Sequence, residues 1–193
     1  MKPAAALAFT LSLAVTPALG HGAHHAATQA ESTSRIEQPI PHVMVRDQTG
    51  GEVALDRLLG NLDETLVLTF TYTNCTSLCP VVVPQAMKIA HELDDAGQET
   101  ALVVMTIDPE RDGLAEMALH ADNLDARDDD RFLSGAPADI FDALRVFGIG
   151  SGNLEEHPGL IVVRHRGSGE FIRIVVGNAG TERLMELVRN VGG

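Results

Sequence analysis

The sequence predicts an α/β domain with a mixed central sheet that is covered by helices on both faces. Two continuous apolar runs, 65–70 and 101–107, are typical of strands that are buried on both sides. Each run is followed by a segment whose apolar residues recur at helical spacing. Two more apolar runs, 160–163 and 171–176, flank a turn that contains two glycines and predict a hairpin.

The first expected element is a hairpin, with strands at 42–47 and 52–55 around the turn Gln48-Thr49-Gly50-Gly51. The strand at 65–70 follows. The next helix is expected over 85–95, with one apolar face formed by Ala86, Ile89, Ala90 and Leu93. Because Pro84 has no amide hydrogen, we expect either a kinked turn before it or a regular helix that begins only near it.

The second half of the domain continues the alternation of strands and helices. The strand at 101–107 precedes a helix with Leu114, Met117, Ala118, Ala121 and Leu124 on one face. A charged loop at 125–131, a helix at 136–147 and a glycine-rich loop at 148–156 come next, and a helix from Thr181 closes the chain. This order is the thioredoxin-like arrangement with an N-terminal β-hairpin added.

The N-terminus predicts export. Residues 1–20 resemble a secretory signal peptide, with Lys2 near the start, an uncharged apolar run over 4–15 and small residues before a cleavage point after Gly20. The alternative is an uncleaved membrane anchor, although the run is shorter than the roughly 20 residues that span a bilayer. We therefore expect residues 1–20 to be the signal peptide, 21–38 a flexible leader and 39–193 the folded domain, in the periplasm or otherwise outside the cytoplasm.

The expected leader contains three histidines, His21, His24 and His25. Short histidine-rich tracts can bind metal ions, but incidental histidines in an unstructured tail are an equal alternative. The chain has a net charge of -13, which argues against a nucleic-acid partner because phosphates require a basic surface.

The two cysteines of the chain, Cys75 and Cys79, lie between the strand at 65–70 and the following helix. At such a junction the free amides and the dipole of the helix favour a thiolate over a thiol. A structural disulfide is the simplest alternative. Closing so short a loop stabilises a fold by only roughly 2 kcal/mol, compared with about 3 kcal/mol for a 15-residue loop.

Four segments in order resemble the Sco/SenC family, which are thioredoxin-fold proteins that help to assemble the CuA centre of cytochrome oxidase. They are Cys75-Thr76-Ser77-Leu78-Cys79-Pro80, Ile107-Asp108-Pro109-Glu110-Arg111-Asp112, Leu133-Ser134-Gly135-Ala136-Pro137-Ala138-Asp139-Ile140 and Glu156-His157. The chain departs from the family at Gly113-Leu114, where Thr-Pro is usual, at Glu156, where aspartate is usual, and at Pro158-Gly159, where small hydroxyl residues are common.

The resemblance implies a copper site formed by Cys75, Cys79 and His157. Two thiolates and an imidazole suit Cu(I) and also allow Cu(II), whereas a structural zinc site would require a fourth protein ligand. Pro158 favours an extended backbone at His157, on a loop that could close over the sulfurs. The implied function is a monomeric metallochaperone rather than an enzyme with turnover. Its implied partner is the CuA-bearing subunit of a respiratory oxidase or another periplasmic copper carrier, and it would meet a membrane only through that recipient or an uncleaved signal.

Two other functions use the same cysteines. The pair could cycle between dithiol and disulfide and reduce target cysteines before metal insertion. A peroxidase of the peroxiredoxin type ranks last, because Thr71 to Asn74 and the arginines offer no convincing peroxidatic element. We assign no ligand role to Asp108, which is expected to cap the following helix, and we expect four histidines to lie on the surface: His42, His91, His120 and His165.

Overall fold

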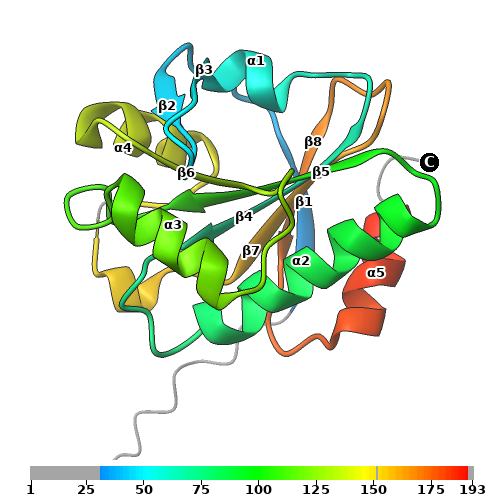
Figure 1. The fold of residues 1–193 in the computed structure, drawn as a ribbon. Coiled ribbons are helices and arrows are strands. Elements are labelled where there is room, and N and C mark those ends of the chain that lie inside the picture. Colours follow the sequence, from blue (N-terminus) through cyan, green and yellow to red (C-terminus); the bar gives the residue numbers. More distant parts are fainter. Residues whose placement is uncertain (1–30, 151, 191–193) are drawn as a thin grey trace, which may run out of the picture.

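A mixed eight-stranded sheet forms the centre of the protein in a computed structural model, which describes residues 31–150 and 152–190. The strand order is β1-β8-β7-β4-β5-β6-β2-β3. The strands are β1 (Ser32–Ile36), β2 (Met44–Arg46), β3 (Glu52–Ala54), β4 (Thr65–Thr71), β5 (Thr100–Thr106), β6 (Arg131–Gly135), β7 (Leu160–Arg164) and β8 (Phe171–Val175). Strands β4, β5 and β6 are parallel to one another, and all other neighbouring pairs are antiparallel (Figure 1).

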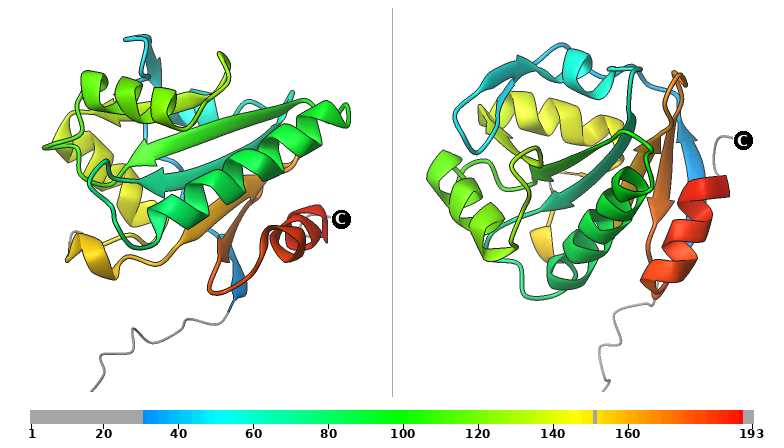
Figure 2. Two further views of the ribbon diagram at one scale, coloured as in Figure 1. Left: turned by 60° about the horizontal axis from the view of Figure 1, so that its bottom comes forward. Right: turned by 45° about the vertical axis from the view of Figure 1, so that its right-hand side comes forward.

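Helices cover both faces of this sheet. They are α1 (Leu55–Leu59), α2 (Cys79–Asp95), α3 (Leu114–Asn123), α4 (Pro137–Val146), the short 3-10 helix η1 (Leu154–Glu156) and α5 (Thr181–Asn190). Adjacent residues of a strand point to opposite faces. On β4, Thr71 contacts His120 of α3, whereas Phe70 packs on Phe147 at the end of α4. Helices α2, α3 and α5 therefore lie on one face and α4 lies on the other (Figures 1 and 2).

The α/β architecture and the thioredoxin-like order of elements are confirmed. The predicted hairpin is the antiparallel pair β2–β3, and the C-terminal hairpin is β7–β8. The predicted apolar face of α2 is buried, with exposures of 0–1% for Ala86, Ile89, Ala90 and Leu93. No helix within residues 31–150 and 152–190 is both long and apolar enough to cross a membrane.

Of the two alternatives expected around Pro84, a regular helix that begins only near this residue is wrong, because α2 is continuous from Cys79. The first amides of the helix explain how it tolerates two prolines. Cys79 N–H donates to Cys75 Sγ, Pro80 has no amide hydrogen to satisfy, and Val81 N–H donates to Leu78 O. Pro84 then removes only a single backbone bond from the first turns.

Strand β1 corrects the prediction that the flexible leader extends to Gln38. Residues 32–36 pair with β8 along their whole length and add an edge strand to the sheet. The sequence Ser-Thr-Ser-Arg-Ile has little apolar character, so the backbone hydrogen bonds of the exposed β8 edge decide its structure. Residues 1–20 and the histidines at 21, 24 and 25 lie outside the described residues.

Two further elements were not predicted. Leu55 begins the short helix α1 instead of ending a strand, and both Leu55 and Leu59 are fully buried. Strand β6 joins β5 to the β2–β3 hairpin and thereby makes one continuous sheet. The sequence of β6 has only two adjacent large apolar residues, Phe132 and Leu133, which is too short a run to distinguish a strand from a loop.

Candidate metal and thiol site

The cysteines lie where strand β4 passes into helix α2. After Thr71 the chain makes a turn that is closed by a hydrogen bond of 3.0 Å from Cys75 N–H to Tyr72 O. Cys79 is the first residue of α2. The two cysteines form a disulfide, with their Cα atoms 5.9 Å apart. The prediction that these two cysteines can form a disulfide is thus confirmed.

The two sulfurs have different surroundings. Cys79 is 4% exposed and belongs to the core, whereas Cys75 is only partly buried. The Cys79 amide, which is the first of α2, donates to Cys75 Sγ at 3.2 Å. An amide at a helix N-terminus stabilises negative charge. Once the disulfide is reduced, this amide therefore favours a thiolate at the more exposed Cys75.

A buried carboxylate fixes the turn that precedes the cysteines. Asp112 is 1% exposed and accepts hydrogen bonds from Thr73 N–H at 3.1 Å and Thr73 Oγ1 at 2.6 Å. It also accepts from Thr106 Oγ1, at the end of β5, at 2.6 Å. The Ser134 hydroxyl on β6 donates to its backbone carbonyl. Sequence analysis included Asp112 only in a family segment, and no local signal shows that its carboxylate reaches back to Thr73.

His157 occupies the loop between η1 and β7. Its backbone is extended, with φ -68° and ψ 140°, as the following proline predicts. Its Nδ1 lies 2.6 Å from the carbonyl oxygen of Leu154. A carbonyl only accepts, so Nδ1 carries the proton and Nε2 carries the lone pair. Burial lowers the pKa of His157, although the Leu154 carbonyl and Glu155 oppose this effect, so the neutral ring is favoured.

Three contacts connect the His157 loop to the cysteine segment and the first turn of α2. The ring of His157 meets the ring of Tyr72 edge-on, with centroids 5.9 Å apart, and Tyr72 Oη donates to Glu155 at 3.3 Å. Gly159 packs on Val82 in the first turn of α2, where an added Cβ would lie 2.8 Å from Val82 Cγ2. The glycine that departs from the family pattern thus allows this loop to approach the helix that Cys79 begins.

Tyr72 lies beside both partners of the predicted site. It contacts His157 and also lines a cavity of about 170 Å³ together with Cys75 and Cys79. Burial raises the pKa of Tyr72, and the carboxylates of Glu155 and Asp108 add to the effect, so its hydroxyl stays protonated. Tyr72 was not identified from the sequence.

The structure does not assemble Cys75, Cys79 and His157 into one cluster. In the described part of the chain, no three His, Cys, Asp or Glu side chains are arranged to hold a metal ion. The disulfide accounts for part of this result, since disulfide sulfurs are not thiolate ligands. The role of these three residues as ligands remains a prediction.

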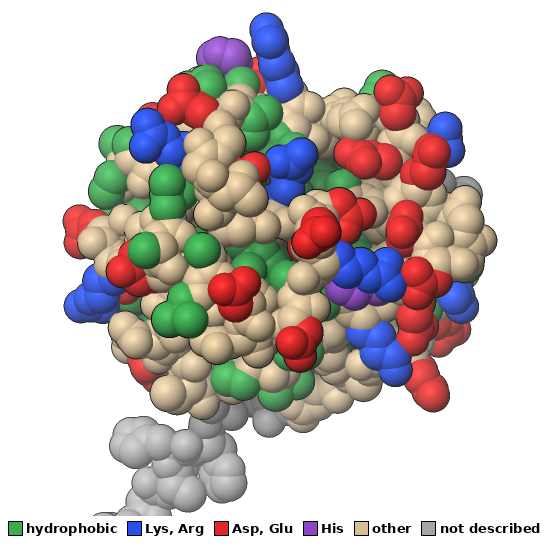
Figure 3. All heavy atoms as spheres, in the orientation of Figure 1, with side chains coloured by type: hydrophobic (Ala, Val, Ile, Leu, Met, Phe, Trp, Pro, Cys, Tyr) green, Lys and Arg blue, Asp and Glu red, His purple; other side chains and the backbone are tan. Residues whose placement is uncertain are grey.

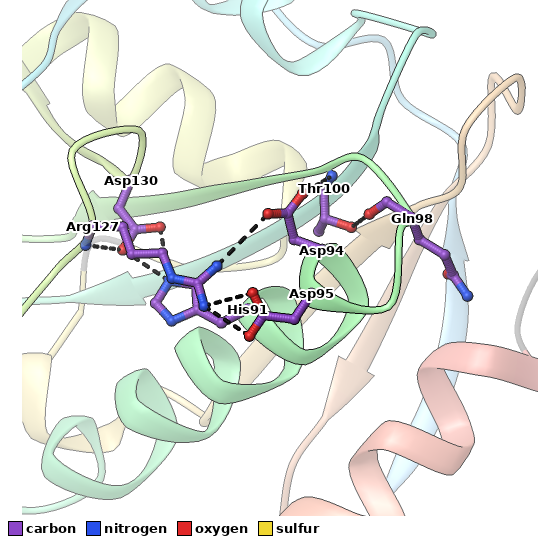
Figure 4. A network of polar contacts seen from close by, with 7 residues as sticks. All are labelled: His91, Asp94, Asp95, Gln98, Thr100, Arg127 and Asp130. Atoms are coloured by element: carbon purple, nitrogen blue, oxygen red, sulfur yellow. Dashed lines mark hydrogen bonds and ion pairs between the residues drawn. The ribbon is translucent and has the colours of Figure 1, made fainter.

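The expectation that His91, His120 and His165 lie on the surface is wrong. His91 is partly buried and pairs with Asp130 at 3.0 Å, in a network that also holds Arg127 (Figure 4). His120 is partly buried on α3, and the Nε2 atom of His165 is buried without a hydrogen-bond partner among the described residues. Among the four histidines predicted to lie on the surface, His42 is the exposed one, and its ring pairs with Asp56.

Asp108 does not cap helix α3. The N-cap of α3 is Gly113, with no side-chain hydrogen bond, and Asp108 instead pairs with Arg111 at 3.0 Å. Its own amide donates to Thr106 Oγ1 at 2.9 Å. Asp108 is 8% exposed.

In the view of Figure 3, the surface over α3 and the start of α2 carries fewer charged side chains than the surface over the far end of α2. Apolar side chains gather there over α3 and the start of α2, while acidic and basic side chains gather toward the far end of α2. Three exposed apolar residues belong to this region: Leu78, Val81 and Leu119. The cysteine pair therefore lies next to a surface that a partner protein can cover at low desolvation cost.

Known structures share this fold. Arabidopsis thaliana ScoI with copper bound has a TM-score of 0.65 and 18% identity over 79% of this chain and 97% of that one. Yeast Sco1 with copper bound has a TM-score of 0.58 and 19% identity over 78% and 94%. BsSco, a Sco-family cytochrome c oxidase assembly protein with a disulfide switch, has a TM-score of 0.64 and 21% identity over 81% and 94%. No curated protein matches the chain in sequence.

The fold and the site define a thioredoxin-like protein whose paired cysteines open a helix at the end of a central strand. The SCO1/SenC family model matches residues 37–189, and the chain belongs to this family. The matched segment includes both cysteines, Asp112 and His157.

Proposed function

We propose that this protein binds copper through Cys75, Cys79 and His157 and delivers it to the CuA-bearing subunit of a respiratory oxidase. The observation that carries the proposal is the hydrogen bond of 2.6 Å between His157 Nδ1 and Leu154 O. Metal-binding histidines commonly donate one ring nitrogen to a carbonyl while the other binds the metal. Family membership supports the same function, as do relatives of the same fold that have copper bound.

Loading requires the reduced protein. Two electrons and two protons convert the Cys75–Cys79 disulfide into two thiols, and each thiol loses a proton when its sulfur binds copper. The Cys79 amide favours the thiolate of Cys75. Within residues 31–150 and 152–190 no amide donates to the sulfur of the buried Cys79, so the metal ion itself must stabilise its negative charge.

The third ligand is expected to arrive by a small movement of the His157 loop. Gly159 already contacts Val82 in the first turn of α2, and the ring of His157 already lies against Tyr72. If the loop that contains Leu154 and His157 turned as a unit about its contact with Tyr72, Nε2 of His157 would approach the sulfurs while Nδ1 kept its bond to the Leu154 carbonyl. A site with only three protein ligands leaves copper open to attack by a ligand of the recipient, which is the step that transfer requires.

Export fits this function. We propose that residues 1–20 direct the protein out of the cytoplasm, where a dithiol is readily oxidised and must be kept reduced for copper loading. Fractionation of cells that produce the full chain, with N-terminal sequencing of the mature protein, tests this location. Retention of the chain in the cytoplasm would refute it.

A copper titration of the reduced protein tests the ligand set. Three variants, Cys75→Ser, Cys79→Ser and His157→Ala, are compared with the wild type in competition with a Cu(I) chelator. We expect either serine variant to lose stoichiometric binding and His157→Ala to bind more weakly. His42→Ala is the matched control, because its exposed ring pairs only with Asp56 and should leave copper affinity unchanged. Wild-type affinity in both serine variants would refute the proposal.

The second candidate function is reduction of target cysteines. It is favoured by the difference between an accessible Cys75, which receives the helix amide, and a buried Cys79. In this reaction the Cys75 thiolate attacks a target disulfide and forms a mixed disulfide. Cys79 then displaces the target thiol, so the protein ends as the disulfide and the target as the dithiol.

Two measurements separate the functions. One follows reduction of an oxidised peptide that carries the CuA cysteine pair, and the other follows copper transfer to the reduced peptide. His157→Ala should slow copper transfer and leave disulfide reduction unchanged, because the imidazole takes no part in thiol exchange. Fast reduction together with absent copper transfer would favour the oxidoreductase.

A further inference from the structure

We propose that His120 is a second imidazole donor for the reduced cysteine pair, so that copper held by Cys75 and Cys79 has two alternative third ligands. The inference rests on the proposed copper binding by these two sulfurs. It extends the site to helix α3, which the sequence analysis did not connect with the cysteines.

The first evidence is the cavity beside the disulfide. Its volume is about 170 Å³, and its lining includes His120 as well as both cysteines. The remaining lining residues are Tyr72, Pro80, Val83, Asn123 and Leu124. His157 does not line this cavity. In the structure as it stands, His120 is therefore the imidazole that shares a cavity with the sulfurs.

The orientation of the His120 ring is the second argument. Its Nε2 lies 3.0 Å from Thr71 Oγ1, and its ring meets Phe132 edge-on at a centroid distance of 6.0 Å. The tautomer that binds a metal through Nδ1 has its proton on Nε2, which then donates to the Thr71 hydroxyl. Among the described residues no hydrogen bond engages Nδ1. A ring fixed through one nitrogen with the other free is the arrangement expected of a ligand histidine.

The surroundings of His120 keep the ring neutral. Burial lowers its pKa, and the nearby Asp112 opposes this effect only in part. Asp112 itself is not a competing ligand, because Thr73 and Thr106 already occupy its carboxylate. A neutral imidazole and two thiolates form the same donor set on the α3 side that His157 would complete on the η1 side.

Two alternative imidazoles have a consequence for transfer. The loop before α2 runs between α3 and η1 (Figure 2, left). Copper can keep both sulfur ligands, with a nitrogen of His120 as the third ligand, while the His157 loop opens toward a recipient. The intermediate with an open His157 loop is then three-coordinate instead of two-coordinate, which limits loss of the ion to solvent.

The test uses Cu(I) and a competing chelator with the reduced full chain, in a background where His21, His24 and His25 are replaced by asparagine. We expect His157→Ala to retain stoichiometric binding. Adding His120→Asn should lower affinity by a further factor of about 10 to 100, the range seen when groups that support a metal are removed. His157→Ala with His42→Asn is the matched control and should bind like His157→Ala alone.

Three outcomes overturn the inference. If His157→Ala abolishes binding, or if the variant lacking both His120 and His157 binds like His157→Ala, then His120 is not a ligand. Loss of binding in Cys75→Ser supports copper binding by the cysteine pair in either case, whereas unchanged binding there refutes the proposed function itself. The His120→Asn variant could lose affinity because it misfolds, so a second measurement keeps His120 in place. Pulsed electron paramagnetic resonance of Cu(II)-loaded His157→Ala, in the same background, should detect an imidazole nitrogen, and its absence also overturns the inference.

Discussion

Asp112 offers the sharpest test of how the fold holds the cysteine turn. Its carboxylate joins Thr73, two residues before Cys75, to Thr106 on the neighbouring strand. Thr106 Oγ1 also accepts the Asp108 amide, so its single hydroxyl proton must go to Asp112. Asp112→Ala would leave three donors without this acceptor: the hydroxyl of the fully buried Thr106, and the amide and hydroxyl of the half-buried Thr73.

The cost follows from these orphaned donors. Each buried donor without a partner costs about 1–3 kcal/mol, so Asp112→Ala should lower the free energy of unfolding by about 3 kcal/mol. Asp112→Asn keeps one carbonyl acceptor and should cost about 1 kcal/mol. Asp63→Ala is the control, since that side chain is exposed and makes no hydrogen bond in the described structure. Equilibrium unfolding in urea measures all three variants in the oxidised state.

A double-mutant cycle isolates the Thr106 contact. Thr106→Val takes the acceptor from the Asp108 amide in either background. It should cost less in Asp112→Ala than in the wild type, because the contact between the Thr106 hydroxyl and Asp112 is already absent there. We expect a coupling free energy of about 1–3 kcal/mol. Asp112→Ala within 0.5 kcal/mol of the wild type, or a coupling free energy near zero, would refute the reasoning.

Further predictions concern other parts of the molecule. Arg164 is 1% exposed and donates to the carbonyls of Leu59, Asn61 and Glu64. Arg164→Met should therefore lower the free energy of unfolding by about 3–5 kcal/mol. Arg164→Lys should recover only part of this loss, because an ammonium group cannot reach all three carbonyls. Burial tends to raise the pKa of Asp47, but hydrogen bonds from Thr49 and Gly51 and the charge of Arg131 lower it below its ordinary value of 3.8. The ionised carboxylate of Asp47 thus stabilises the fold above that pH. In urea titrations, the free energy of unfolding of the wild type should exceed that of Asp47→Asn by less as the pH falls below 3.8. A difference that does not change with pH would contradict this. Nitrogen NMR shifts of His157 should report a protonated Nδ1, and an Nε2–H tautomer would remove the main support for its role as ligand. Gly159→Ala should weaken copper binding because its Cβ displaces the loop from Val82, and wild-type affinity would show that this contact is dispensable.

Sequence patterns predicted the elements whose burial is periodic. The two apolar runs became β4 and β5, the apolar face expected at 85–95 is buried in α2, and the helix expected at 136–147 is α4. Strand β1 and helix α1 were missed because their structure depends on what they contact. A polar segment becomes a strand only because β8 presents a free edge, and α1 is held by two buried leucines.

The residues of the site also divide into those that the sequence could locate and those that it could not. The cysteines could be located from their spacing at a strand-to-helix junction, and His157 from its likeness to a family segment. Three other residues, His120, Asp112 and Tyr72, could not be located from the sequence. Each contacts residues that are far away in the chain, and no local pattern indicates such a contact. Asp112 reaches Thr73 over 39 residues, and His120 reaches Thr71 over 49.

The two sides of the site differ in how firmly the fold holds them. The sulfur side is anchored by the buried strand β4, the buried face of α2 and the carboxylate of Asp112. The imidazole side depends on the three-residue helix η1, one carbonyl contact to His157 and the packing of Gly159. Local opening is expected where buried contacts are few. Release of a bound ion should therefore begin with movement of His157, while Cys75 and Cys79 stay in place until a recipient ligand has reached the metal.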